Sequence, residues 1–332
     1  MSVKNFVGID VSKLTFDVFI RENRVHKQFK NELKGFELFV QWLEKQIQHS
    51  LKSTLVCFEH TGLYSLPLAL FLEKEHIPFA MLSALEIKKS MGITRGKNDL
   101  VDSKRIAEFA YRFKDKISET KLPAADIRKI QSLLTLRDRL TTNMTGYIVS
   151  MNETMRTMRE EDLPELFSAY QTQILILKEE IKKLEHAIKA LIRNNPQLRT
   201  SYELITTIKG IGFIVASYLI VYTYNFTRFD NWRKFACYSG IAPFDYQSGT
   251  SVRGKTQVSS IANKQVKKLL HLAAMTAIHF DTELREYYIR RQVDGKSKMA
   301  IINIIRNKII SRVFAVIKRG TPFVDIKKYA RT

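Results

Sequence analysis

Two acidic residues stand three positions apart in a strongly basic setting, in the segment 97–106, which reads KNDLVDSKRI. Asp99 and Asp102 lie between Lys97 and Arg105, in a chain that carries 54 lysine and arginine residues. Acids in such a setting usually balance local charge at the surface, but they can also be held together to bind a cation. If the segment is helical, residues i and i+3 share a face, so both carboxylates would point the same way.

Two more acids stand at the ends of apolar segments earlier in the chain. Asp10 lies within GIDVSK and Glu59 within CFEHTG. Asp10 has apolar, strand-like neighbours, and a carboxylate there is costly to bury unless it is paired or metal-bound. The alternative is an aspartate at a strand end with no further role.

The elements that must position these acids follow from hydrophobic spacing. Residues 5–20 predict two strands with a turn near Ser12 and Lys13, and strands are also predicted over 24–31, 53–59 and 77–82. Helical spacing covers 34–48, 66–76 and about 83–91. Three consecutive strands, followed by strands that alternate with helices, predict an α/β domain with a mixed sheet covered by helices.

This arrangement can bring the four acids together. The first and fourth strands can be parallel neighbours, which would place Asp10 beside Glu59, and a helix packed across them would add Asp99 and Asp102. Four carboxylates in one place repel strongly unless a cation neutralises them. Ligands with oxygen donors alone suit Mg²⁺ or Mn²⁺, and two such ions form a clamp for phosphoryl transfer. Lys97 and Arg105 would then face phosphate.

Charge and composition narrow the class of protein. The 332 residues carry a net charge of +21, which indicates a polyanionic partner, most simply nucleic acid. Residues 1–115 hold 18 basic and 14 acidic residues, whereas residues 231–332 hold 20 and 6, so the last third is the expected phosphate-binding surface. The two cysteines form no CxxC or Cys/His cluster, and the longest apolar run is too short to span a bilayer, so we expect a cytoplasmic protein without membrane contact.

Two long helices are predicted after the first domain, over 126–161 and about 166–194. The first carries an apolar stripe of Leu133, Leu136, Leu140, Met144, Tyr147 and Met151. In the second, apolar residues step by three and four in a heptad seam, at Ile174, Leu177, Ile181, Leu184, Ile188 and Leu191. The seam is consistent with a hairpin that packs within one chain or with a contact between two copies.

The C-terminal region contains a glycine turn and a basic cluster. Lys209, Gly210 and Gly212 lie in IKGIG, between two helical segments, in a pattern that resembles a helix-hairpin-helix turn. Such a turn can present backbone N–H groups to phosphate, or it can be a tight interhelical turn with no ligand. Cations gather further on, at Arg253, Lys255, Lys264, Lys267 and Lys268.

These motifs together resemble one family. GIDVSK, EHTG and KNDLVD look like the three acidic motifs of the DEDD-type insertion-sequence transposases of the insertion-sequence-110 group, although Asn98 stands where the third motif usually has threonine. IKGIG, RFDNWRKFACYSGIAPFDYQSG and VRGK resemble the C-terminal transposase domain of the same group. The resemblance spans residues 7 to about 270.

The resemblance implies a fold, a reaction and partners. It implies an RNase H-like, RuvC-like N-terminal domain with Asp10, Glu59, Asp99 and Asp102 as a metal-binding tetrad. Lys13, after the first of these acids, is an expected nucleic-acid contact. It implies that Ser248 attacks a DNA phosphodiester and forms a phosphoserine link. It also implies donor and target DNA, a structured bridge RNA encoded by the element, and a dimer that assembles to a tetramer.

The residues alone leave the role of Ser248 open. A serine beside a glycine in a basic loop is usually a turn residue, and no histidine or lysine base stands next to Ser248. A metal-dependent, RuvC-like nuclease with water as the nucleophile is therefore the alternative, and a nucleic-acid scaffold that does no chemistry is a third. We expect three domains: the catalytic α/β domain over 1–120, a coiled-coil arm over 121–200, and a mostly helical, basic transposase domain over 201–332.

Overall fold

The computed structural model describes residues 3–90, 99–244, 247–248, 252–253, 257–259 and 261–325. By its internal contacts the chain divides into two compact units, Met1–Leu122 and Pro123–Thr332. The second unit contains both the long helices and the C-terminal helices. The division into three domains stays a prediction.

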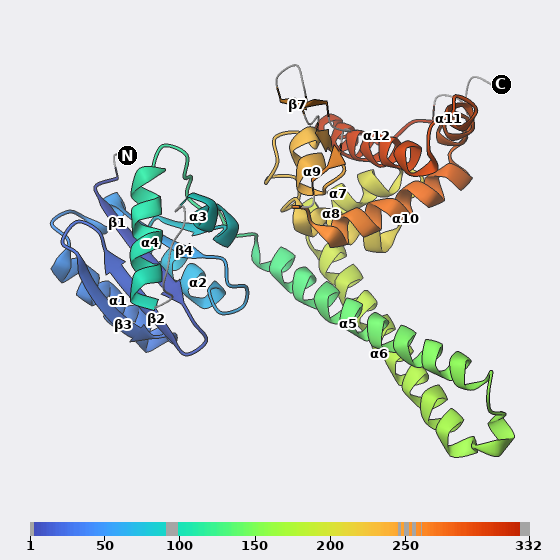
Figure 1. Ribbon diagram of the computed structural model, residues 1–332, viewed down its shortest axis with the longest axis horizontal. Helices are drawn as coiled ribbons and strands as arrows, with labels where there is room; N and C mark the ends of the chain where they lie inside the picture. The colour runs from blue at the N-terminus through green and yellow to red at the C-terminus, as the bar shows by residue number, and fades with distance from the viewer. Residues whose placement is uncertain are drawn as a thin grey trace. The chain divides into compact units, whose positions relative to one another are not determined.

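A five-stranded mixed sheet forms the centre of the first unit (Figure 1). Its strands are β1 (Asn5–Val11), β2 (Thr15–Ile20), β3 (Val25–Lys30), β4 (Thr54–Glu59) and β5 (Phe79–Leu82). The order across the sheet is β3-β2-β1-β4-β5, with β1 antiparallel to β2 and parallel to β4. The predicted mixed sheet is confirmed, and so is the parallel pairing of the first and fourth strands.

Helices cover both faces of this sheet. On one face, α1 (Leu33–Gln46) and α2 (Leu66–Lys74) enclose a core that includes Phe16, Phe39 and Phe58, while the short 3-10 helix η1 (Leu51–Ser53) leads into β4. On the other face lie α3 (Ala84–Ser90) and α4 (Asp99–Arg112), around Cys57 and Ile106. Figure 1 shows α4 crossing in front of the strands. The alternation of side chains along each strand thus feeds two separate cores.

A long helical hairpin opens the second unit. It consists of α5 (Ala125–Thr154) and α6 (Pro164–Asn194), which are joined through the 3-10 helix η2 (Glu160–Asp162). The helix predicted over 126–161 was too long, because the chain reverses after Thr154 through a stretch that contains neither glycine nor proline. Pro164, at the first position of α6, is the one sequence signal for this turn.

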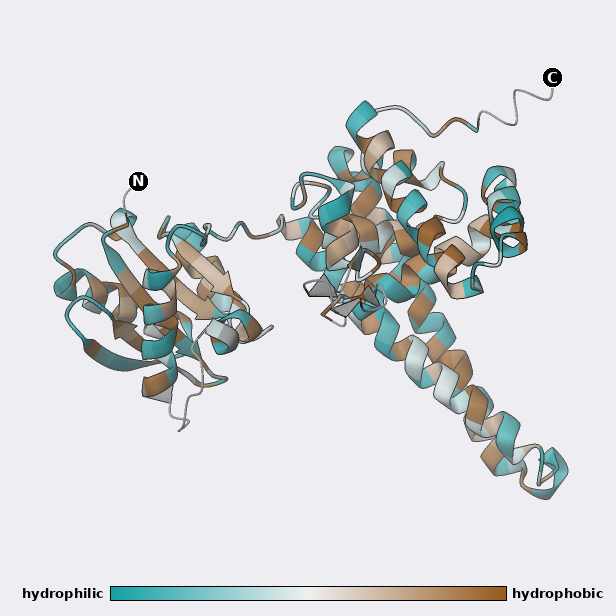
Figure 2. Ribbon diagram, turned by 45° about the horizontal axis from the view of Figure 1, so that its top comes forward, coloured by the Kyte–Doolittle hydropathy of each residue, from teal (hydrophilic) through white to brown (hydrophobic). Residues whose placement is uncertain are grey.

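The heptad seam of α6 packs within the chain, against α5. Ile181 and Ile188 are buried, and the other members of the seam are half-buried. The stripe predicted on α5 was wrong in part, since Leu136 and Tyr147 are exposed, and α5 buries Ile127, Ile130 and Leu134 instead. Figure 2 shows apolar and polar segments alternating along both helices, as expected for a two-helix hairpin.

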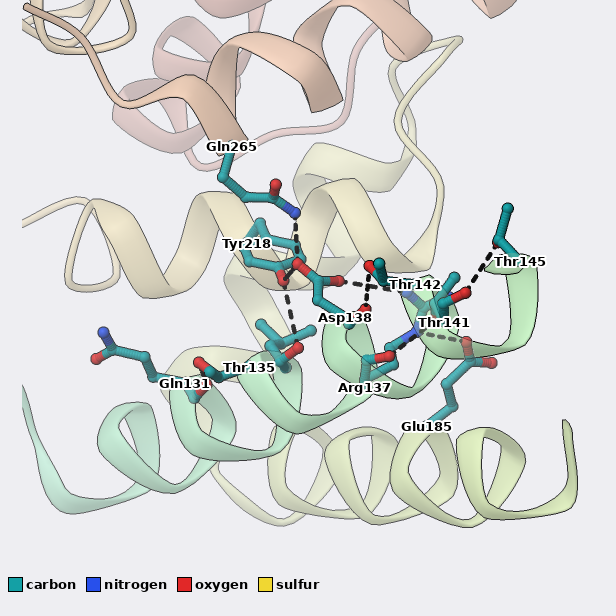
Figure 3. Close-up of polar contacts among 11 residues, drawn as sticks. Gln131, Thr135, Arg137, Asp138, Thr141, Thr142, Thr145, Glu185, Tyr218 and Gln265 are labelled. Atoms are coloured by element: carbon teal, nitrogen blue, oxygen red, sulfur yellow. Dashed lines mark hydrogen bonds and ion pairs between the residues drawn. The ribbon is translucent and has the colours of Figure 1, made fainter. Parts of the chain in front are cut away.

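Polar contacts fix the base of this hairpin to the helices that follow it (Figure 3). The Tyr218 hydroxyl, on α8 (Phe213–Tyr222), donates to the carboxylate of Asp138 on α5. The Gln265 amide, on α10 (Lys264–Phe280), donates to the same carboxylate oxygen at 2.5 Å. Arg137 forms an ion pair with Glu185 of α6 at 2.7 Å. Burial and the bond to Asp138 raise the pKa of Tyr218, so the phenol remains a donor.

The rest of the second unit is mostly helical, as predicted. Besides α8 and α10 it contains α7 (Pro196–Thr206), α9 (Trp232–Tyr238), α11 (Thr282–Val293) and α12 (Lys298–Arg319). Short strands interrupt the helices where the sequence predicted a polar loop; they are β6 (Pro243–Phe244), β7 (Gln247–Ser248), β8 (Val252–Arg253) and β9 (Gln257–Val258). β6 pairs with β9, and β7 pairs with β8. None of the helices described here is both long and apolar enough to cross a membrane.

Candidate active site

Asp10 lies near the end of β1, on the face of the sheet that α4 covers. Successive residues of a strand point to opposite faces, so Asp10 shares its face with Phe6 and Gly8. Phe6 belongs to the core that contains Ile106 of α4. Asp10 itself is half-buried.

Glu59 is the last residue of β4 and stands beside Asp10. Ile9 pairs with Phe58 in the parallel register of β1 and β4, and both residues belong to the core on the far face. Asp10 and Glu59 follow these two residues, so they lie on neighbouring strands and on the same face. The adjacency predicted from the sequence is therefore present in the sheet.

Gly8 allows α4 to approach β1 closely. A Cβ at position 8 would lie 2.1 Å from the carbonyl oxygen of Ser103 and 2.4 Å from the amide nitrogen of Ala107, which no other residue could accommodate. This contact brings the first turns of α4, with Asp102, onto the face that carries Asp10 and Glu59. Asp99 is the first residue of α4, and its side chain lies outside what the structure describes.

Electrostatics link Glu59 to Asp102. Burial of the Glu59 side chain, together with the nearby Asp102 carboxylate, raises the pKa of Glu59. Asp102 is half-buried, and one of its oxygens accepts a hydrogen bond from Arg105 at 2.8 Å. The site thus holds two like charges near each other, with one cation on the same helix as partial compensation.

The carboxylate oxygens of this site are suitable ligands for a divalent cation, but the side chains lie further apart than they would around a bound ion. Carboxylate oxygens are the ligands that Mg²⁺ and Mn²⁺ prefer, and a carboxylate whose pKa is raised beside a second carboxylate, as that of Glu59 is, gains from a cation. Among the described side chains, which exclude that of Asp99, no group of three or more His, Cys, Asp and Glu residues could hold a metal ion. A cation held by Asp10, Glu59 and Asp102 would draw these carboxylates closer together than they lie here.

A fifth acid, Asp17, faces the same side of the sheet and was missed in the sequence. Asp17 pairs directly with Asp10 in the antiparallel register of β1 and β2, and it is only 6% exposed. Its two oxygens contact Nε2 of His26 and Nε2 of Gln28, both on β3, at 2.8 Å each. The signal was the same as for Asp10, an acid inside an apolar strand, here in TFDVFI.

The remaining residues predicted in and around the first unit lie in different places. Lys13 is exposed in the turn between β1 and β2. Lys97 lies outside the described residues.

In the second unit, the backbone of a short hairpin carries two predicted site residues. Ser248 pairs with Val252, and Gln247 pairs with Arg253, so Ser248 and Arg253 lie on adjacent strands. Their side chains, and all of Lys255, lie outside the described part of the chain.

Packing against α10 explains why the turn at Gly210 requires a glycine. Gly210 has a φ of 94°, and a Cβ there would lie 2.3 Å from the carbonyl oxygen of Ala273 on α10. At Gly212, the residue before α8, an added Cβ would meet no atom within 4 Å. A groove of about 730 Å³ runs past this turn, and its lining includes Lys189, Lys209 and Phe280. The turn therefore serves interhelical packing and leaves its outer side open.

The predicted lysines of α10 lie in its first two turns. Lys264 and Lys268 are exposed and Lys267 is half-buried, while the core side of the helix carries Val266 and Leu270. Asn263 caps the helix by accepting a hydrogen bond from the backbone amide of Val266. The three cations thus share the outward face of a well-anchored helix.

Comparisons with known proteins match both halves of the chain. A family model described as Transposase, of the IS110 DEDD type, matches residues 7–159, which contain all four predicted acids. A second model, described as Transposase IS116/IS110/IS902 family, matches residues 186–289.

Curated relatives agree with this match. The pilin gene-inverting proteins of Moraxella lacunata and Moraxella bovis are each 28% identical to this chain over 333 residues, which is 96% of this chain and 98% of theirs. The insertion element IS110 uncharacterized 43.6 kDa protein of Streptomyces coelicolor is 30% identical over 151 residues, which is 45% of this chain and 36% of that protein. The chain belongs to the IS110 family of DEDD transposases, which are enzymes that act on DNA.

Proposed function

We propose that this transposase cuts and rejoins DNA strands with an acidic tetrad and a serine nucleophile, at sites chosen by an element-encoded bridge RNA. The observation that carries the proposal is the approach of Glu59 and Asp102 on the face that also bears Asp10. Their mutual repulsion has no evident structural benefit, whereas a cation would relieve it. The same face lies in the first matched family segment.

Asp10, Glu59, Asp99 and Asp102 are the proposed holders of Mg²⁺ or Mn²⁺. When bound, the ion would supply charge stabilisation to a phosphate and polarise a hydroxyl. The protein's own contribution is positional: β1 and β4 align two carboxylates, and Gly8 lets α4 bring a third. Arg105, paired with Asp102, would keep that side chain oriented.

Ser248 is the proposed nucleophile. Its Oγ would lose a proton and form a bond to the phosphorus, and the bond from phosphorus to the leaving DNA oxygen would break as that oxygen takes up a proton. Attack by a DNA hydroxyl on the phosphoserine would reverse these changes and release Ser248. Arg253 and Lys255 would stabilise the charge on the phosphate oxygens. The number of phosphodiester bonds is conserved, so rejoining needs no ATP.

Partners follow from the charge and from the family. A net charge of +21 supports the binding of DNA and of a structured RNA, with Lys13, Lys97, Lys209, Lys264, Lys267 and Lys268 as proposed contacts and Gly210 and Gly212 as the turn beside them. Sequence choice would then rest on base pairing with the RNA. The reaction would take place in the cytoplasm.

Self-association through the hairpin is part of the proposal. The seam of α6 is used within the chain, so the surface left for a second copy includes the exposed Leu175 and Ile176, at 61% and 50% exposure. Changing both to lysine should reduce the particle mass seen by light scattering without unfolding the hairpin. An unchanged mass would exclude this surface as the contact.

The alternative is a metal-dependent nuclease in which water attacks and Ser248 is structural. The names of the Moraxella relatives favour recombination, because inverting a gene requires that cut ends be rejoined. A nuclease would leave free ends.

A covalent-trapping experiment separates the two mechanisms. Wild type and Ser248→Ala are incubated with DNA that is nicked near the crossover, denatured, and examined for protein-linked DNA. Wild type should form an adduct that mass spectrometry places on Ser248, and Ser248→Ala should bind DNA and RNA without forming it. An adduct on Tyr246 would reassign the nucleophile, and cleavage by wild type without any adduct would favour water.

A further inference from the structure

The second unit buries an arginine that has no carboxylate partner among the described residues. Arg306, in the middle of α12, is 5% exposed. Its Nε is buried without a hydrogen-bond acceptor. Within the described part of the chain, no aspartate or glutamate lies at ion-pair distance from it. A buried, uncompensated charge is costly, so a role outside the resting fold is indicated.

Arg312, nearly two turns further along α12, has the carboxylate partners that a poorly exposed arginine usually has. Its guanidinium reaches Asp281 at 2.6 Å and Glu283 at 2.7 Å. Among the described residues, carboxylates thus pair with the half-buried Arg312 of this helix, whereas none pairs with the buried Arg306.

In the described part of the chain, the Arg306 side chain donates a hydrogen bond to His271 of α10. Nη2 of Arg306 lies 2.7 Å from Nδ1 of His271. Because a guanidinium can only donate, Nδ1 accepts, and the neutral imidazole carries its proton on Nε2. Burial and the positive charge of Arg306 lower the pKa of His271, and burial lowers the pKa of Arg306, as expected where no counter-charge is near.

The outer nitrogen of His271 lies on the basic face of α10. His271 is half-buried and follows Lys264, Lys267 and Lys268 at helical spacing, so the four side chains share one face. In the described residues Nε2 makes no hydrogen bond, and it is not among the buried polar atoms without partners. Arg306 thus sets the tautomer so that an N–H donor is presented among three lysines.

We propose that His271 and Arg306 form a phosphate-binding pair for nucleic acid. His271 donates Nε2–H to a phosphodiester oxygen, and Arg306 beneath it supplies the buried positive charge. The proposal rests on the nucleic-acid binding proposed above. It adds Arg306, which was not among the predicted nucleic-acid contacts. Arg306 lies beyond the segment matched by the second family model, which ends at residue 289.

The test uses full-length protein and two labelled probes, a short duplex DNA and an RNA hairpin, each titrated over a range of salt concentrations. Arg306→Met should weaken binding of at least one probe about tenfold. It should also lower the slope of log affinity against log salt by about one. The probe that responds identifies the source of the phosphate. Without nucleic acid, the unfolding temperature of Arg306→Met should be equal to or above that of wild type, since an uncompensated charge is gone.

Arg312→Met is the matched control. It should lower the unfolding temperature by roughly ten degrees, because two carboxylates lose their partner, and it should leave the salt slope unchanged. At position 271, Gln can accept from Arg306 and donate outward, so His271→Gln should retain affinity, whereas His271→Leu should lose it as Arg306→Met does.

Three results would overturn the proposal. A lower unfolding temperature of Arg306→Met with unchanged salt slopes for both probes would make Arg306 a structural residue. If wild type shows no salt-dependent affinity for either probe, the proposed nucleic-acid binding itself fails. If wild type binds nucleic acid and Arg306→Met leaves the salt slopes unchanged, only the proposed role of the His271–Arg306 pair is excluded.

Discussion

The two units of this transposase bury charges of opposite sign. In the first unit, burial and the nearby Asp102 carboxylate raise the pKa of Glu59, and Asp17 is buried opposite Asp10. In the second unit Arg306 is buried without a carboxylate among the described residues, and its neighbour is another titratable base. Proteins usually pair such groups, as Arg312 does with Asp281 and Glu283.

The contrast indicates which kind of ligand each unit suits. Acids held near one another call for a cation, and a buried cation among lysines calls for an anion. Phosphoryl transfer on nucleic acid needs both, a metal ion and a phosphate backbone. Charge that is only partly compensated among the described residues is therefore common to both units, and its sign distinguishes the two proposed roles.

The largest effect should come from the acidic unit. Asp102→Asn should lower DNA cleavage by at least about a hundredfold, because charge stabilisation by a metal ion contributes several kcal/mol. Nucleic-acid affinity should stay near that of wild type, and a chelator should reproduce the loss. Cleavage is measured on labelled DNA in Mg²⁺, and near-normal cleavage by the variant would refute the tetrad.

In the second, basic unit, substitutions should change nucleic-acid binding. Replacing Lys264, Lys267 and Lys268 with Gln should lower the slope of log affinity against log salt by about three, at roughly one unit for each lost contact. The unfolding temperature should barely change, since Lys264 and Lys268 are exposed and Lys267 is half-buried. Fluorescence anisotropy over a salt series measures the slope. An unchanged slope would place the phosphate contacts elsewhere.

Asp17→Asn should have a moderate effect on folding. The Asn side chain keeps one oxygen but has an NH₂ group in place of the other. That NH₂ group would face the donor of His26 or Gln28, so one buried hydrogen bond is lost at a cost of about 1–3 kcal/mol. Urea unfolding measures this change, with Gln28→Ala as the control that removes one of the donors. If Asp17→Asn is more stable than wild type, the repulsion between Asp17 and Asp10 outweighs the hydrogen bond that the variant loses.

The smallest effect concerns Glu59 and pH. Its raised pKa means that the folded state holds the proton more tightly than the unfolded chain, so this stabilisation is full below the ordinary carboxyl pKa and is lost as the pH rises through the folded value. In chelator, Glu59→Gln should therefore unfold at a slightly higher temperature than wild type at neutral pH, and at an equal one below about pH 4.

Adding Mg²⁺ extends this test. The ion should stabilise wild type more than Glu59→Gln, because a carboxylate is a better ligand than an amide. If Mg²⁺ shifts the two proteins equally, Glu59 does not contact the ion.

Much of the first unit could be predicted because its signals are local. Strands of β-branched and apolar residues, separated by turns, gave the five strands, and their order limited the sheet to few arrangements. The hairpin was harder. The stripe of α5 was misassigned at Leu136 and Tyr147, because several apolar rows run along a long helix and the partner helix selects one of them.

The candidate site divides in the same way. Asp10, Glu59 and Asp102 stood out as acids at strand and helix positions, whereas Asp17 carried the same pattern and was passed over. The α10 lysines were visible as a cluster, but nothing in the spacing of α12 separated Arg306 from Arg312. Gly210 was interpreted as a possible phosphate turn, and the structure shows that its close contact with Ala273 already requires glycine.

By itself, the sequence determined the classes of element, the basic character of the last third, and the acids available for a metal, because these depend on residue type and on neighbours along the chain. Only the tertiary structure decided that α4 meets β1 at Gly8, that Asp17 faces Asp10, and that Arg306 lies buried against His271 without a carboxylate among the described residues. Each of these depends on residues far apart in sequence. Whether a charge is compensated is a property of its neighbours in space, and spacing along the chain does not record them.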